Sequence, residues 1–151
     1  MNQETEPMGP WIQFAVICQT ALTEASGQVS IIRIFDRMIL PGSTPTMQPQ
    51  VVQLTLVVAF KSGQYNGNAK IGVRPIKPSG EEMPQMEFSA LFEGAERGNQ
   101  LILPIGFPVD EDGLYWFDIT VNGQRYTRVP LRLMYQQMVL PGQMGFGPPP
   151  A

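Results

Sequence analysis

The sequence predicts one all-β domain, an antiparallel β-sandwich of about eight strands with Greek-key connections and disordered tails. Short segments of alternating apolar and polar residues recur along the chain, and turn residues separate them at sandwich spacing. No segment shows the 3.6-residue periodicity of a convincing helix. A chain of 151 residues is long enough for one such core and too short for two domains of ordinary size.

The domain boundaries follow from the composition at the two ends of the chain. Residues 1–10 are acidic and polar, which predicts a disordered N-terminal tail and is unlike a secretory signal. Residues 141–151 are rich in proline and glycine and have little to bury, which predicts a second disordered tail. The β-sandwich domain is therefore expected at residues 11–140. A proline-docking role for the second tail is the alternative to an inert one.

The first two strands are expected at residues 11–19 and 28–35, which are rich in β-branched and aromatic side chains. Residues 11–19 are apolar at both odd and even positions, as in a buried strand. Residues 20–27 connect the two, and a helical turn there is the weaker interpretation. Residues 41–49 contain three prolines, which excludes regular structure and predicts a long crossover loop between sheets.

Four further strand candidates fill the middle of the chain. The even positions of residues 51–60 are apolar, so this face is expected in the core. Residues 69–74 alternate again after an Asn-Gly turn and end before a proline. Residues 85–92 and 100–107 are the other candidates, and Pro104 places the second of these at a sheet edge or a bend.

The last two strands, residues 114–121 and 125–133, allow the faces of a hairpin to be assigned. The odd positions of residues 115–121, and Val129, Leu131 and Leu133 of the second strand, are apolar and are expected to point into the core. A simple two-residue turn at Asn122-Gly123 would put these apolar sets on opposite faces, so a three-residue loop or a bulge beside the turn is required. The corrected register predicts two cross-strand pairs: Phe117 with Val129, and Asp118 with Arg128.

The outer face of this hairpin carries tryptophan, tyrosine and arginine, which are enriched at binding hot spots. We expect a partner-binding surface formed by Leu114, Trp116, Tyr126, Arg128 and Arg132. The expected partner is another protein or a second copy of the chain, so that the domain is a non-catalytic interaction or self-assembly module. The alternative is a small-ligand or carbohydrate-binding sandwich in which the two aromatic rings act as stacking platforms.

Charge and hydropathy exclude two classes of partner. The formal net charge is -3 and no basic cluster occurs, so no nucleic acid is expected as a partner. No apolar run approaches the roughly 18 residues of a membrane helix, so no membrane is expected either. Only 15% of the residues are charged, which leaves part of the surface apolar and favours contacts with proteins.

The chain has no histidine, which removes the commonest general base and most zinc sites. We therefore expect no enzyme, no catalytic residue, no cofactor and no metal. Asp110, Glu111 and Asp112 form an acidic cluster in a turn, and calcium binding or a carboxylate-dependent enzyme is the less favoured interpretation. Cys18 is the single cysteine, lies in an apolar segment, and is expected to be a buried, unreactive thiol.

The segment Glu111-x-Gly113-x-Tyr115 is similar to the Asp-x-Gly-x-Tyr corner of immunoglobulin-like domains, in which the tyrosine hydroxyl fixes the loop before a late strand. Glutamate replaces the aspartate in this chain. Phe117 stands where antibody domains have a disulfide cysteine. The resemblance thus implies an immunoglobulin-like sandwich without that bridge, which suits a reducing compartment.

Residues 12–133 also resemble a bacterial family of small cytoplasmic immunoglobulin-like or C2-like β-sandwich proteins of unknown function. The resemblance implies a fold and a cytoplasmic location, and it supplies no catalytic or binding residue. It rests on the following matches: Cys18, Gly27-Gln28, Phe35-Asp36, Pro41 to Pro49, Gly113, Tyr115, Asn122-Gly123 and Val129-Pro130-Leu131.

Overall fold

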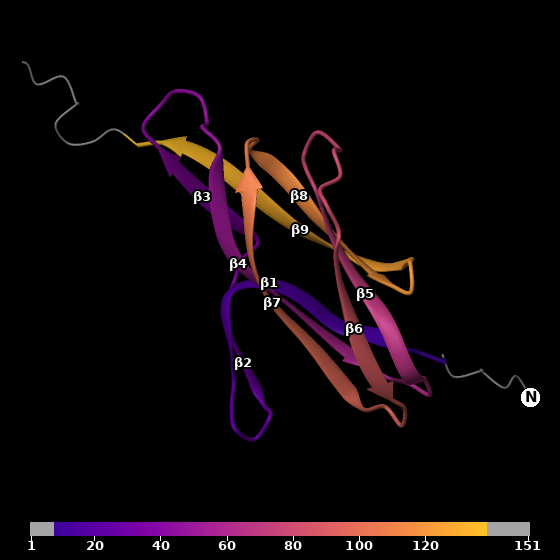
Figure 1. The fold of residues 1–151 in the computed structure, drawn as a ribbon. Helices are drawn as coiled ribbons and strands as arrows, with labels where there is room; N and C mark the ends of the chain where they lie inside the picture. Colours follow the sequence, from indigo (N-terminus) through magenta and orange to yellow (C-terminus); the bar gives the residue numbers. More distant parts are fainter. Residues whose placement is uncertain (1–7, 139–151) are drawn as a thin grey trace, which may run out of the picture.

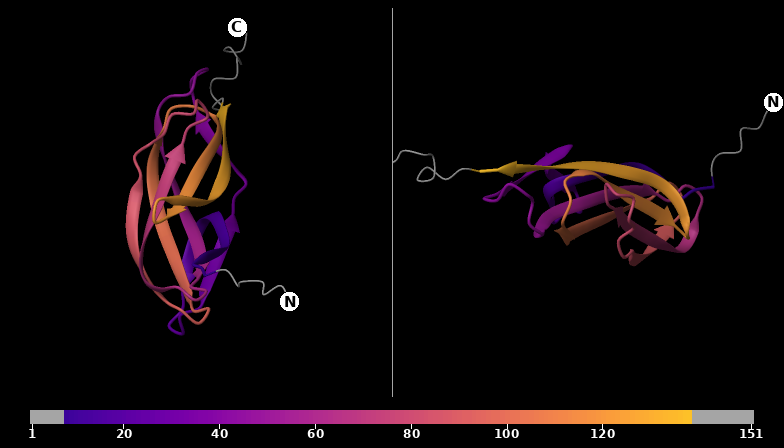
Figure 2. Two further views of the ribbon diagram at one scale, coloured as in Figure 1. Left: turned by 90° about the vertical axis from the view of Figure 1, so that its right-hand side faces the viewer. Right: turned by 90° about the horizontal axis from the view of Figure 1, so that it is seen from above.

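A computed structural model describes residues 8–138, which form two β-sheets packed face to face (Figure 1). The first sheet has the order β2-β1-β4-β7 and consists of β1 (Trp11–Thr23), β2 (Val29–Ile34), β4 (Gln50–Lys61) and β7 (Gly98–Val109). The second has the order β3-β9-β8-β5-β6 and consists of β3 (Arg37–Gly42), β5 (Asn66–Ile76), β6 (Met86–Glu93), β8 (Gly113–Val121) and β9 (Gln124–Gln137). Figure 2 shows the same strands from two further sides. The all-β sandwich predicted from the sequence is confirmed.

The core lies between the sheets and is centred on β4 and β8. On β4 the predicted even positions are buried, with Leu54 3% and Leu56 0% exposed. On β8 the predicted odd positions are buried as well. Phe117 is 0% exposed, and its ring lies 5.6 Å from that of Phe107 on β7, in an edge-to-face arrangement. Aromatic pairs prefer this geometry, so the two sheets are joined by directional as well as apolar contacts.

Strand β3 is an element that the sequence analysis did not predict. Residues 41–49 were expected to lack regular structure, but Pro41 and Gly42 end β3, and only residues 43–49 cross between the sheets. Proline is tolerated there because β3 is the edge strand of its sheet. β3 pairs in parallel with β9, so the expectation of a purely antiparallel sandwich is corrected at this one pair of strands.

The hairpin of β8 and β9 has the predicted register. Both expected pairs are present: Phe117 opposite Val129, and Asp118 opposite Arg128. The two-residue turn does form, with positive φ angles at Asn122 and Gly123 (49° and 83°). A register shift between Ile119 and Thr120 then compensates for it and leaves Tyr126 without a directly opposite residue. Of the two solutions that the sequence allowed, the chain uses the bulge.

The start of the domain differs slightly from the expected boundary at residue 11. The carbonyl of Met8 accepts a 3.1 Å hydrogen bond from the Gln64 amide, and Pro10 is buried. Residues 8–10 therefore belong to the sandwich and not to the expected tail at residues 1–10. The rest of that tail, the expected tail at residues 141–151 and the end of the expected domain at residue 140 lie outside the described residues.

Two smaller expectations concern the first sheet. Residues 20–23 continue β1 and pair with β2, so the alternative of a helical turn there is wrong. Pro104 lies in β7, which is an edge strand, as the proline predicted. Within residues 8–138, no helix is long and apolar enough to cross a membrane.

Candidate functional site

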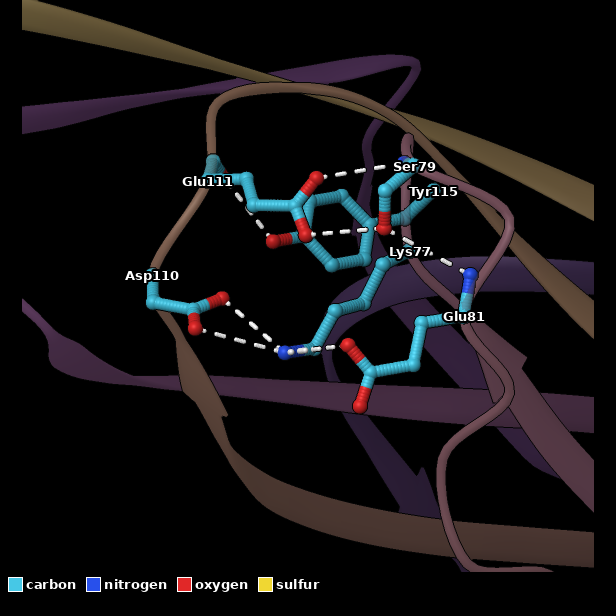
Figure 3. Close-up of polar contacts among 6 residues, drawn as sticks. All are labelled: Lys77, Ser79, Glu81, Asp110, Glu111 and Tyr115. Carbon is cyan, nitrogen blue, oxygen red and sulfur yellow. Dashed lines mark hydrogen bonds and ion pairs between the residues drawn. The ribbon is translucent and has the colours of Figure 1, made fainter.

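The acidic cluster at the start of β8 is built into a network of structural contacts (Figure 3). The Nζ atom of Lys77 lies 3.1 Å from Asp110 and 3.5 Å from Glu81. The carboxylate of Glu111 accepts two 3.1 Å hydrogen bonds from Ser79, one from its amide and one from its hydroxyl. These contacts fasten the loop that follows β5 to the loop that precedes β8.

Tyr115 anchors the same corner from inside the core. Its side chain is 0% exposed, and its hydroxyl donates a 2.7 Å hydrogen bond to the backbone carbonyl of Glu111. This is the geometry expected of the corner motif. Burial raises the pKa of the Tyr115 phenol to about 12. Glu111 replaces the usual aspartate, and its longer side chain reaches Ser79, from which it accepts a hydrogen bond.

The carboxylates of this corner do not converge on a common point. Asp110 is directed toward Lys77 and Glu111 toward Ser79, while Asp112 is exposed. Among residues 8–138, no group of three His, Cys, Asp or Glu side chains is arranged to hold a metal ion. The hydrogen bond to Asp110 is the main cause that raises the pKa of the Lys77 ammonium. The arrangement therefore has the features of a structural clamp.

Within the expected partner-binding surface on β8 and β9, Arg128 contacts two side chains of β8. The guanidinium of Arg128 lies 5.5 Å from the ring centroid of Trp116, which is a cation–π contact. The same guanidinium forms a two-pronged ion pair with Asp118, with atom separations of 2.6 and 3.2 Å. One side of the Trp116 ring is thus occupied by a side chain that is itself fixed in place.

The structure divides the five expected partner-binding residues between separate places. Leu114, Trp116 and Arg128 line a depression of about 620 Å³ together with residues of the loop after β5. Tyr126 is half-buried against core residues and lines a different depression of about 440 Å³, next to the start of β1. Arg132 is exposed opposite Leu114 and lines neither depression. Tyr126 departs from its expected outward position because it occupies the bulge.

A second surface lies on the side of the first sheet that faces away from the core. Strand alternation and register place small side chains at its centre, and these are almost fully buried. Larger apolar side chains surround this centre and are exposed. We call this surface the outer apolar face. Its centre consists of Cys18, Thr55, Val57 and Ala59. Its exposed apolar residues include Phe14, Leu22, Ile32, Ile34 and Val51.

The exposure of these residues is large for apolar side chains. Ile34 and Val51 are each 63% exposed, and Leu22 is 53% exposed. These apolar residues lie on the same side of three neighbouring strands, β1, β2 and β4, with the polar side chains of Thr20 and Gln53 between them. Exposed apolar side chains gathered on one face mark sites of interaction with other macromolecules.

The sequence contained a signal for the outer apolar face that was interpreted differently. Residues 11–19 are apolar at both odd and even positions, and β4 is as well through Val57 and Ala59. This pattern predicts a strand with two apolar faces. It does not reveal that only one of the two faces is covered by the second sheet.

Cys18 lies at the centre of the outer apolar face. It is a free thiol with 0% exposure, as predicted. Its Sγ atom lies 3.5 Å from the carbonyl oxygens of Thr20 and Thr55. Burial raises the pKa of the thiol, which lowers the fraction of reactive thiolate.

The two sheets, the tyrosine corner and the sandwich core define an immunoglobulin-like β-sandwich. The particular group is given by a family model that matches residues 13–134: the chain belongs to the family of unknown function DUF6941. The family identity agrees with the resemblance found in the sequence. A comparison with curated proteins finds no match.

Two solved structures are similar to this chain at low sequence identity. One is an alkylpurine DNA glycosylase, AlkC, of Pseudomonas fluorescens, bound to DNA with an abasic site analog, with 12% identity and a TM-score of 0.40. The match covers 80% of this chain and 30% of that chain. The other is an immunoglobulin-like protein of Pseudomonas aeruginosa, with 8% identity and a TM-score of 0.40, covering 83% of this chain and 96% of that chain.

Proposed function

We propose that this protein is a non-catalytic β-sandwich that binds another protein or itself. The outer apolar face is the observation that carries the proposal. Exposing several large apolar side chains on one face to water is unfavourable, and burial against a partner removes that cost. The depression beside Trp116 is a second contact region, because tryptophan and arginine are enriched at the centres of interfaces.

The clamped acidic corner supports a structural role for the chain's most clustered carboxylates. Asp110 and Glu111 use their oxygen atoms to fasten two loops, and Tyr115 uses its hydroxyl for the same purpose. Groups with these fixed partners do not need a substrate to satisfy them. A cytoplasmic location is part of the proposal, and the buried, free thiol of Cys18 suits a reducing compartment.

The alternative of a carbohydrate-binding sandwich is less well supported by the geometry. A stacking platform needs a free aromatic face, whereas Arg128 covers one side of the Trp116 ring. Tyr126 lines a different depression and does not extend the platform. A thermal-shift screen with glycans and metabolites tests this alternative, because a ligand that binds the folded state raises the melting temperature.

The proposal is tested by combining mass measurement with partner recovery. The tagged chain is used to isolate binding partners from its host, and light scattering gives the mass of the purified chain. We expect an association that is lost in Ile34→Glu or Trp116→Ala and retained in Ile39→Glu. Ile39 is a matched control because it is 60% exposed, against 63% for Ile34, and lies in the other sheet. A strict monomer from which neither variant releases a partner contradicts the proposal.

A further inference from the structure

We infer that two copies of this chain associate through the outer apolar face, with their four-stranded sheets packed against each other about a two-fold axis. The inference rests on the proposed function, because it names the partner of the surface that carries it. Three properties of this face favour a second copy as that partner: its charge, its area and the state of the sheet edges beside it.

The charge of the face is compatible with its own copy. Among the residues of β1, β2, β4 and β7 that point to this side, Lys61 at the end of β4 is the only charged one. A two-fold interface brings the same patch of two copies together, so like charges in it would repel. A nearly uncharged patch avoids this repulsion. It also offers nothing that would select an acidic or a basic partner.

The ion pairs on the outer sides of the sheets lie elsewhere. The outer side of the second sheet carries ion pairs between Arg128 and Asp118 and between Lys70 and Glu87. The two outer sides of the sandwich therefore differ in charge: the second sheet carries ion pairs beside exposed apolar residues such as Ile39 and Leu91, and the first sheet, within the described residues, carries no ion pair on this side. Charge depletion is typical of the centre of a protein interface.

The area of the face is close to what a stable dimer needs. The strands β4 and β7 have 12 residues each. With about 3.3 Å per residue and about 4.8 Å between strands, the four-stranded sheet presents on the order of 700 Å² on one side. A standard interface buries about 800 Å² on each partner. Two sheets of the same twist also pack with their strands nearly aligned, and a second copy supplies the same twist.

The two outermost strands of this sheet, β7 and β2, carry features that disfavour the addition of another strand. β7 contains Pro104 and Pro108, which lack the amide hydrogen needed to continue a ladder. On the opposite edge, Arg33 of β2 has a φ of 56°, which interrupts the extended backbone. Association through β7 or β2 is thereby disfavoured, which favours the face as the route of contact.

Sedimentation equilibrium of the full chain tests the inference. The expected result is a mass of twice the chain's 16.8 kDa, with dissociation on dilution. The double variant Ile34→Glu/Val51→Glu places like charges at two of the most exposed positions of the face. We expect it to weaken self-association by at least about tenfold. The matched control is Ile39→Glu/Leu91→Glu, since these residues are 60% and 56% exposed and lie in the second sheet.

Circular dichroism and urea unfolding establish that each variant is folded, and the milder Ile34→Thr/Val51→Thr is used if the charged variant is not. A wild-type chain that stays monomeric up to about 100 μM overturns the inference. So does a folded face variant that dimerises like the wild type. If a monomeric wild type still binds a different protein and the face variant releases it, the proposed function survives and the second copy is excluded. A monomer that instead binds neutral phosphatidylcholine vesicles through this face also overturns the inference.

Discussion

Tyr115 shows how one side chain can secure both a loop and a core. Its ring fills space between the sheets, while its hydroxyl leaves the ring at the point where the chain enters β8. Gly113 allows this entry because it has a φ of 127° and lies against Pro78, where a side chain would be crowded. The corner therefore depends on the identity of single residues.

Tyr115→Phe is expected to lower the free energy of unfolding by about 1 kcal/mol, because the Glu111 carbonyl loses its partner inside the protein. Urea denaturation measures the change. Tyr65→Phe is the matched control, since the Tyr65 hydroxyl also donates a 2.7 Å hydrogen bond, to the carbonyl of Asn68, at an exposed site where water can replace it. Equal denaturation midpoints for wild type and Tyr115→Phe would show that the corner bond does not stabilise the fold.

Arg128 shows why a residue type alone does not define a binding site. Tryptophan and arginine at outer positions favoured a partner surface, and the sequence places both correctly on the outside of the hairpin. Their mutual contact, and the pairing of Arg128 with Asp118, depend on rotamers that strand alternation does not specify.

At the scale of elements, the hairpin of β8 and β9 is the part of the fold that the sequence predicted best. Two strands with strong alternation must put their apolar sides on one face, and this condition alone excludes the simple register. The position of the bulge could not be derived in the same way, because either of two corrections satisfies the condition. Tyr126 was assigned to the outer face for that reason, whereas the bulge turns it toward the core.

β3 was missed because its signal is weak and its partner is distant. It ends in Pro41-Gly42, a pair of residues typical of turns, and it pairs in parallel with β9, which lies almost a hundred residues later. β-propensity depends on context and differs between edge and central strands, so it is a weak guide at this position. The outer apolar face was missed for a related reason, since only the layer arrangement shows which side of a sheet is covered.

The turn between β8 and β9 is expected to stabilise the domain. Asn122 has a φ of 49°, and its side-chain oxygen accepts a 2.9 Å hydrogen bond from the Lys70 amide. Asn122→Ala is expected to destabilise the domain by about 1–2 kcal/mol, because alanine tolerates this φ poorly and cannot accept the bond.

Asn122→Gly separates the two causes, since glycine adopts the same φ freely but also lacks the acceptor. We expect its urea midpoint to lie between those of the wild type and Asn122→Ala. If the glycine variant is as unstable as the alanine variant, the hydrogen bond accounts for the whole effect and the backbone argument fails.

At the scale of the whole molecule, the corner makes the free energy of unfolding fall as the pH rises through the alkaline range. An unfolded tyrosine loses its proton near pH 10, whereas Tyr115 in the fold does so near 12. Its contribution is therefore complete below pH 10 and is lost as the pH rises toward 12. Lys77 acts in the same direction, because its raised pKa favours the charged form in the folded state.

We expect the free energy of unfolding to fall by about 2 kcal/mol between pH 9 and 11.5 because of Tyr115 alone. Urea unfolding across this range measures the decline, and Tyr115→Phe provides the comparison. The variant should show a shallower decline than the wild type, since it has no phenol at this position. Identical slopes for the two chains would mean that other groups cause the alkaline loss.

The prolines of β7 and the positive φ of Arg33 also bear on how large an assembly of this chain can become. A sheet that accepts new strands at its edges grows without limit and forms fibres. A face that is buried in a two-fold interface is no longer exposed, so a third copy cannot bind to it. With an apolar face and two outermost strands that disfavour strand addition, association of the first sheet is expected to stop at a dimer.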